Sequence, residues 1–242
     1  FYHSGETEDV DFVCALLRAR FPTRPIMVIG FSLGGNILLK YLGEQGTKNT
    51  AGLCAAVAIS VPYDLFAGAE ALERRGLTKV YAGYFLRSLL AKVRAKEAIL
   101  ANILDLDAVR ASATLRDFDD AATAKLNGFA NADDYYRKCS SNRFLQSVRV
   151  PTLLLHSLDD PFLPASALPI SAIEANRFLT LVLTEGGGHV GFVEGGAPWN
   201  PTFWMEEQSA SFLAYHHRGA SATTSRANPP VPGRVDPNPE NI

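Results

Sequence analysis

The chain has 242 residues, of which 47% are hydrophobic and 20% are charged, and its formal net charge is −2. This length suits one sizeable core with an insertion better than two domains, and the composition is typical of a globular protein and not of a disordered or membrane protein. A net charge close to zero gives no strong attraction to nucleic acid or anionic lipid, so we expect a small-molecule partner and no nucleic acid.

The cysteines and the apolar runs exclude other classes of protein. Cys14, Cys54 and Cys139 are widely spaced and lack the C-x-x-C clustering of a zinc or redox site. We therefore expect buried structural thiols and no metal. No run approaches the roughly 18 to 20 apolar residues of a membrane span, and no signal-peptide pattern opens the chain. The sequence therefore predicts a cytoplasmic protein without an integral membrane span.

The first 60 residues alternate between helical and strand patterns. A helix is predicted from a cap at Thr7 to about Phe21, and the wholly apolar run at 26–30 is typical of a strand buried on both faces of a parallel sheet. A second helix over 36–46 and a second buried strand over 55–60 follow. This order predicts an α/β fold with a mostly parallel sheet and helices on both faces.

The segment from Leu65 to Arg149 contains helical patterns and no buried-strand run. The clearest helix covers residues 77–100, and it is predicted to carry one apolar stripe. The residues of this stripe are Leu77, Val80, Tyr81, Tyr84, Phe85, Leu89 and Val93. Because the segment interrupts the strands, we expect a helical cap over their carboxyl ends, where α/β proteins bind ligands. In that position its apolar residues would favour acyl chains.

The strand pattern resumes at 151–157 and 179–183, and a helix over 203–217 closes the core. The residues beyond Gly219 are polar and rich in proline, which predicts disorder. The predicted α/β core has two parts, residues 1–64 and residues 150–218. A helical cap over 65–149 lies between them, and a disordered tail covers 219–242.

The sequence Gly30-Phe-Ser32-Leu-Gly34 lies between a predicted strand and a predicted helix. It matches the Gly-x-Ser-x-Gly elbow, in which the chain turns so sharply that a Cβ at either glycine is expected to clash. Ser32 would then stand exposed at the carboxyl edge of the sheet. The backbone N–H of Leu33, at the helix N-terminus, would contribute to an oxyanion hole.

A serine nucleophile needs a base, and the base needs an acceptor that fixes its tautomer. Asp159 and Asp160 follow the predicted strand at 151–157, and His189 follows the next strand, in the order that such elbows require. Asp160 is favoured as the acid because it opens an Asp-Pro-x-x-Pro turn, and Asp159 stays open as the alternative. The remaining histidines are weaker candidates for the base: His3, His156, His216 and His217.

Several separate motifs in order resemble one family. The stretches YHSGETEDV, VIGFSLGGNILLKYLGE, FDDAATAKLNGFANADDYY, LDDPFLP and GGGHVGFVEG are similar to the YheT-type branch of the α/β-hydrolase superfamily. The resemblance runs from Tyr2 to about His217. It implies an α/β-hydrolase fold in which Ser32 is the nucleophile, Asp160 the acid and His189 the base. It also implies hydrolysis of carboxylic esters such as acylglycerols, phospholipids or medium-chain esters, without a metal or organic cofactor.

Members of this family carry a longer N-terminal part, with the early strands and a second oxyanion-hole donor. The resemblance therefore implies an N-terminally truncated member that lacks the early strands. The predicted function is a serine hydrolase that cleaves esters through an acyl-enzyme on Ser32. Two alternatives stay open at this point: an alcohol O-acyltransferase with the same triad, and a truncated remnant without catalytic activity.

Overall fold

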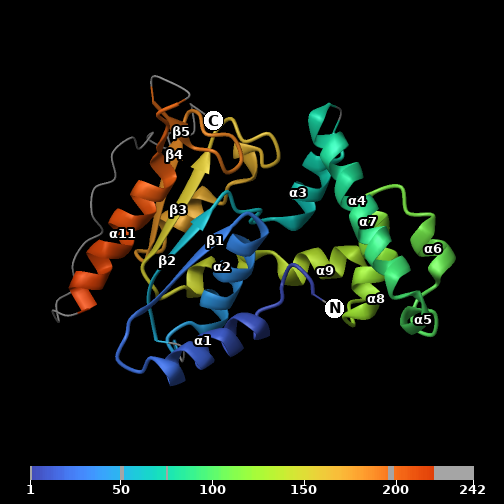
Figure 1. Ribbon diagram of the computed structural model, residues 1–242, viewed down its shortest axis with the longest axis horizontal. Helices are drawn as coiled ribbons and strands as arrows, with labels where there is room; N and C mark the ends of the chain where they lie inside the picture. Colours follow the sequence, from blue (N-terminus) through green and yellow to red (C-terminus); the bar gives the residue numbers. More distant parts are fainter. Residues whose placement is uncertain (1, 50–51, 75, 196–198, 221–242) are drawn as a thin grey trace. The chain divides into compact units, whose positions relative to one another are not determined.

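The computed structural model describes residues 2–49, 52–74, 76–195 and 199–220 (Figure 1). The chain divides into two compact units. The first, here called the α/β unit, combines the described residues of Ser4–Tyr63 with those from Ser141 to Ala220, and the second, the helical unit, combines Tyr2 and His3 with the described residues of Asp64–Ser140.

The α/β unit is built on a parallel sheet. Within the described residues its strands follow the order β1-β2-β3-β4, and every neighbouring pair is parallel. The strands are β1 Ile26–Phe31, β2 Leu53–Ile59, β3 Thr152–Ser157 and β4 Leu179–Thr184. Two parallel strands need a crossover connection, which α2 (Leu33–Gln45) and α10 (Ile170–Glu174) provide after β1 and β3. The predicted α/β fold with a parallel sheet is confirmed.

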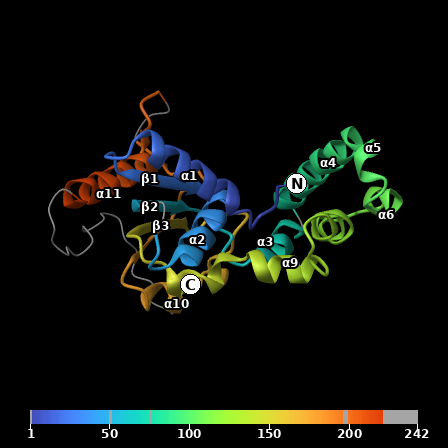
Figure 2. The ribbon, with the colours of Figure 1, turned by 90° about the horizontal axis from the view of Figure 1, so that it is seen from below.

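Helices cover both faces of this sheet, with α1 and α2 on one side and α11 on the other (Figure 1 and Figure 2). The side chains of β2 alternate accordingly: Ala56 and Ala58 pack in the core with α1 and α2, whereas Val57 and Ile59 pack in the core with α11. Burial on both faces explains why β2 is apolar at nearly every position. Helix α1 spans Glu8–Arg20 and α11 spans Trp204–Ala220.

The prediction that β1 is buried on both faces is wrong. Ile29 is 41% exposed and Phe31 is 46% exposed. Both side chains lie opposite residues of β2 on the face that α11 covers, but α11 packs on β2 and β3. In the described part of the chain, β1 pairs only with β2. An apolar run therefore marks the strand, while its burial depends on neighbouring elements.

Some helix ends differ from the expected ones. Thr7 occupies the N-cap position of α1, but its hydroxyl donates to Glu44 Oε2 at 2.8 Å instead of capping the helix. Helix α2 begins at Leu33, three residues earlier than expected. Helix α11 continues to Ala220, so the first two residues of the predicted tail are helical; the rest of that tail lies outside the described residues.

The described residues of the helical unit contain helices and no strand. Leu86, Leu100, Val109 and Phe118 form one buried cluster within it. The helices are α3 Leu65–Leu72, α4 Leu77–Ala95, α5 Glu97–Leu100, α6 Leu106–Arg110, α7 Leu115–Phe118, α8 Ala124–Leu126 and α9 Ala132–Cys139. Across both units, no helix of the described chain is long and apolar enough to span a membrane.

Helix α4 does not carry the predicted single stripe. Leu86 is 9% exposed and packs in the cluster with Leu89 and Val93 at its edge, whereas Tyr84 is 62% exposed. Each residue turns a helix by about 100°, so Tyr84 and Leu86 point to nearly opposite sides. The predicted stripe therefore combines two faces, of which the exposed one carries Val80, Tyr81, Tyr84 and Phe85.

Candidate active site

Ser32 occupies the tight turn between β1 and α2. Its φ of 49° is uncommon for any residue other than glycine, and its N–H donates to the carbonyl of Ile59 at 2.8 Å. Although Ser32 stands at the N-cap position, its side chain makes no capping hydrogen bond to α2. Its Oγ lies instead 2.8 Å from Nε2 of His189. The strained turn thus directs the Ser32 hydroxyl toward His189 in the loop after β4.

The turn requires glycine at positions 30 and 35, whereas the sequence predicts positions 30 and 34. A Cβ on Gly30 would lie 2.6 Å from the carbonyl oxygen of Gly34, and a Cβ on Gly35 would lie 2.7 Å from Cγ2 of Val61. A Cβ on Gly34 would meet no atom within 4 Å. The expected clash at Gly34 is therefore wrong: the close approach of α2 to the sheet falls one residue later, at Gly35.

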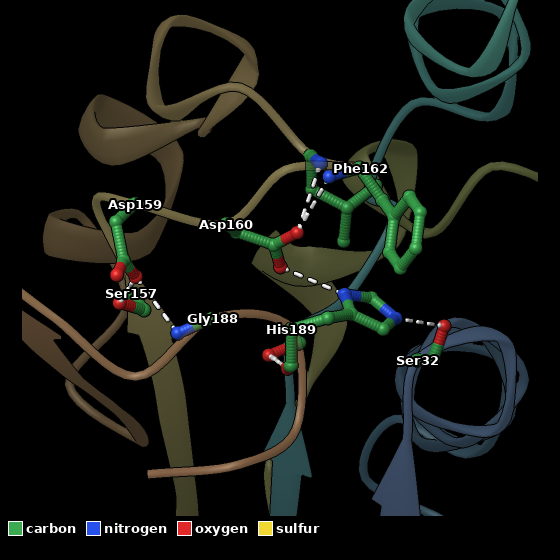
Figure 3. Close-up of polar contacts among 9 residues, drawn as sticks. Ser32, Ser157, Asp159, Asp160, Phe162, Gly188 and His189 are labelled. Atoms are coloured by element: carbon green, nitrogen blue, oxygen red, sulfur yellow. Dashed lines mark hydrogen bonds and ion pairs between the residues drawn. The ribbon is translucent and has the colours of Figure 1, made fainter. Parts of the chain in front are cut away.

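Asp160 contacts the edge of the His189 ring that points away from Ser32 (Figure 3). Oδ2 of Asp160 lies 2.8 Å from Nδ1 of His189, and the Asp160 side chain is fully buried. Oδ1 of the same carboxylate accepts the backbone N–H groups of Phe162 at 2.8 Å and Leu163 at 3.2 Å. Because both oxygens have donors, the carboxylate has a fixed orientation toward the imidazole.

The topology of the sheet brings these side chains together. Ser32 directly follows β1, Asp160 follows β3 and His189 follows β4. The carboxyl ends of parallel strands meet at one edge of the sheet, which is where α/β proteins place their sites. Residues separated by 157 positions in the chain thereby come within hydrogen-bond distance.

Asp159 points away from the His189 ring, unlike Asp160 (Figure 3). Its Oδ1 accepts a hydrogen bond from the hydroxyl of Ser157 and another from the backbone N–H of Gly188, at 2.8 Å for the latter. These two hydrogen bonds hold the pKa of Asp159 below its usual value, so the carboxylate stays charged at neutral pH. A turn residue would bind only amides of its own turn, whereas Asp159 binds an amide of the loop that carries His189.

The competing histidines occupy other environments. His156 is buried within β3, and this burial lowers its pKa. His216 packs against Phe212 on α11, with 4.5 Å between the ring centroids. His3 packs edge-on against Phe129 in the helical unit. His189 itself contacts the Phe162 ring edge-on at 5.0 Å.

Ser60 also contacts the His189 segment at the carboxyl edge of the sheet, and it is not predicted from the sequence. Ser60, which directly follows β2, donates its hydroxyl to the backbone carbonyl of His189. Its sequence signal is weak, because it reads as the last residue of an apolar run. Its position at the carboxyl end of a buried strand is the feature that could have identified it.

Among the described residues, no group of three or more His, Cys, Asp or Glu side chains is arranged to hold a metal ion.

Comparison with known proteins finds a family and several relatives. The model of Hydrolase_4, described as serine aminopeptidase, S33, matches residues 5–194. YheT of Escherichia coli, whose name describes a candidate esterase, is 37% identical over 88% of this chain and 62% of its own length. Mouse phospholipase ABHD3 is 37% identical over 84% of this chain and 49% of its own. The monoacylglycerol lipase of Saccharomyces cerevisiae is 32% identical over 89% of this chain and 48% of its own. The chain thus spans between about half and 62% of the length of these relatives.

Proposed function

The chain belongs to the Hydrolase_4 family and is an α/β hydrolase of the YheT and ABHD3 type, and from that membership we propose that the protein is a serine hydrolase that cleaves carboxylic esters. One observation carries the proposal: the chain of contacts from Ser32 Oγ through His189 to Asp160, with 2.8 Å at each step. A hydroxyl, an imidazole and a buried carboxylate in this order form the activated nucleophile of acyl transfer.

In the proposed reaction, Ser32 Oγ attacks the ester carbonyl while His189 Nε2 takes the hydroxyl proton. The imidazolium returns this proton to the leaving alcohol, and an acyl-enzyme forms on Ser32. Asp160 accepts the Nδ1–H of His189, which keeps Nε2 free to act as the base. Water then attacks the acyl-enzyme with His189 as the base, the bond between Ser32 Oγ and the acyl carbon breaks, and the imidazolium returns the proton to Oγ as the acid leaves.

The oxyanion of each tetrahedral intermediate needs hydrogen-bond donors beside Ser32. The N–H of Leu33 belongs to the first turn of α2 and has no partner within the helix. It also lies at the positive end of the helix dipole. We assign Leu33 as one oxyanion-hole donor on this basis. Each such donor contributes about 2.7 to 4 kcal/mol to stabilisation of the transition state.

The surroundings of the two reacting side chains favour an apolar acyl group. Leu33 follows Ser32, Val190 follows His189, and both side chains are exposed. Each methylene that such surfaces remove from water adds about 0.8 kcal/mol of binding. The names of two relatives, a phospholipase and a monoacylglycerol lipase, support lipid esters. We therefore propose medium-chain acyl esters or acylglycerol and phospholipid esters as the substrate class.

A fluorophosphonate probe and a series of p-nitrophenyl esters test this function. The complete protein should react covalently with the probe, and Ser32→Ala should abolish labelling. Hydrolysis should rise from acetate toward octanoate and exceed cleavage of alanine p-nitroanilide, an aminopeptidase substrate. Labelling that persists in Ser32→Ala would remove Ser32 from the role of nucleophile, and preferential cleavage of the anilide would replace the esterase proposal.

A further inference from the structure

The backbone on the N-terminal side of His189 has an anchor that neither Ser32 nor Asp160 provides. Asp159 Oδ1 accepts the N–H of Gly188 at 2.8 Å, and the hydroxyl of Ser157 at the end of β3 orients the same oxygen. The carboxylate is ionised at neutral pH, so its hydrogen bond to the amide is charge-assisted. Adjacent aspartates therefore hold the two parts of the histidine segment, Asp160 the ring and Asp159 the backbone.

The other side of the His189 backbone is anchored from β2. The hydroxyl of Ser60, a residue with no exposed surface, donates to the carbonyl of His189. The N–H of Ser60 in turn donates to Leu155 O of β3 at 2.8 Å. This anchor is therefore tied to two neighbouring strands of the sheet.

The segment that carries His189 needs such anchors. Gly186, Gly187 and Gly188 precede it, with φ values of 156° for Gly187 and 61° for Gly188. Three consecutive glycines have more conformational freedom than any other tripeptide, and both positive φ values are accessible to glycine at low cost. A free segment of this kind would let Nε2 of His189 move away from Ser32.

We propose that Asp159 and Ser60 are positioning residues that fix the backbone of His189 on its two sides and so keep its ring aligned with Ser32. Neither residue touches the reacting atoms. Their part in catalysis rests on the proposed function above, whereas their effect on the mobility of the glycine segment does not. A displacement of about 1 Å at a catalytic group can cost about 100-fold in rate, so a partial loss of alignment should be measurable.

Paired substitutions at Asp159 test the proposal in the complete protein. Asp159→Ala removes the acceptor, whereas Asp159→Asn keeps a side-chain oxygen that can accept the Gly188 N–H. We expect Asp159→Ala to lower kcat roughly tenfold with KM unchanged, and Asp159→Asn to stay within about threefold of the unmodified protein. Ser60→Ala should also lower kcat without changing KM.

Hydrogen exchange of the amides in residues 186–192 provides a readout that does not require activity. Exchange should accelerate in Asp159→Ala and much less in Asp159→Asn. Asp105→Ala is the matched control, because the exposed Asp105 accepts two backbone amides at 3.0 and 3.1 Å at the start of α6 in the helical unit. It should leave kcat and this exchange unchanged.

The outcomes separate the two proposals. Faster exchange in Asp159→Ala, in a protein that neither hydrolyses esters nor reacts with the fluorophosphonate, would support the anchoring role and overturn the esterase function. Unchanged exchange and unchanged kcat in Asp159→Ala, in a protein that does hydrolyse esters, would overturn the positioning role alone. An equal loss of kcat in Asp159→Ala and Asp159→Asn, with unchanged exchange, would also overturn it.

Discussion

Nδ1 of His189 meets Asp160 and not the neighbouring Asp159, although both carboxylates come after the same strand. The difference lies in the direction of the turn after Asp160, whose Oδ1 accepts the N–H groups of Phe162 and Leu163. These two bonds leave Oδ2 as the oxygen that faces the imidazole. The tautomer of His189, and with it the proposed chemistry of the site, depends on that orientation.

Asp160→Asn should lower kcat by about 10⁴-fold, with little loss of folded protein. The asparagine oxygen would keep the bonds from Phe162 and Leu163, so its NH₂ group would face His189. A donor there favours the imidazole tautomer with its proton on Nε2, which cannot take the proton of Ser32. Ester hydrolysis measures the effect, and Asp64→Asn, which alters an N-cap of α3 instead, serves as the control. Activity near that of the unmodified protein would remove Asp160 from the role of acid.

Alanine substitutions at the three elbow glycines should differ in their effects on stability. Gly30→Ala and Gly35→Ala each place a Cβ within 2.7 Å of another atom, so each should lower the free energy of unfolding by about 1 to 3 kcal/mol. Gly34→Ala meets no neighbour within 4 Å and lies within α2, so it should be neutral or stabilise by up to about 1 kcal/mol. Urea unfolding measures all three. A loss at Gly34 equal to that at Gly30 would contradict this interpretation of the turn.

His156 should make the stability of the protein sensitive to mildly acidic pH. Burial lowers the pKa of His156 below its ordinary value of 6.5 and outweighs the opposing effect of the Asp160 charge. As the pH falls below 6.5, the unfolded chain binds a proton that the folded protein does not, so the free energy of unfolding falls. The slope from this one group is at most about 1.4 kcal/mol per pH unit.

His156→Leu removes that group and should flatten the dependence between pH 6.5 and pH 5. The quantity to compare is the difference in the free energy of unfolding between variant and unmodified protein at each pH, because contributions of other titrating groups then cancel. If this difference in the free energy of unfolding stays constant between pH 6.5 and pH 5, His156 binds its proton equally in the folded and unfolded states, which would contradict the prediction.

The two faces of α4 should respond differently to truncation. Leu86→Ala removes a side chain from the buried cluster of the helical unit and should cost about 2 to 3 kcal/mol of stability. Tyr84→Ala removes a largely exposed ring on the opposite side and should cost less than about 1 kcal/mol. Thermal unfolding distinguishes them. Equal losses would indicate that the exposed face also packs in the folded protein.

Local sequence patterns are enough to predict the fold class and the candidate residues of the site. Apolar runs at 26–30 and 55–60 marked buried-type strands, and helical periodicity between them indicated parallel pairing. Ser32, Asp160 and His189 each come after such a strand. Local pattern suffices for this, because the carboxyl ends of parallel strands converge whatever the packing details are.

Features that depend on contacts between distant segments cannot be predicted from such patterns and are known only from the folded structure. The exposure of Ile29 results from the reach of α11 across the sheet. The need for glycine at 35 and not at 34 results from the position of Val61 against α2. The contact of Asp159 with Gly188 joins loops after two different strands. Residue spacing predicts the face of a helix or strand on which a side chain lies. The features above depend instead on distances of a few ångströms between different elements, and no local pattern specifies those distances.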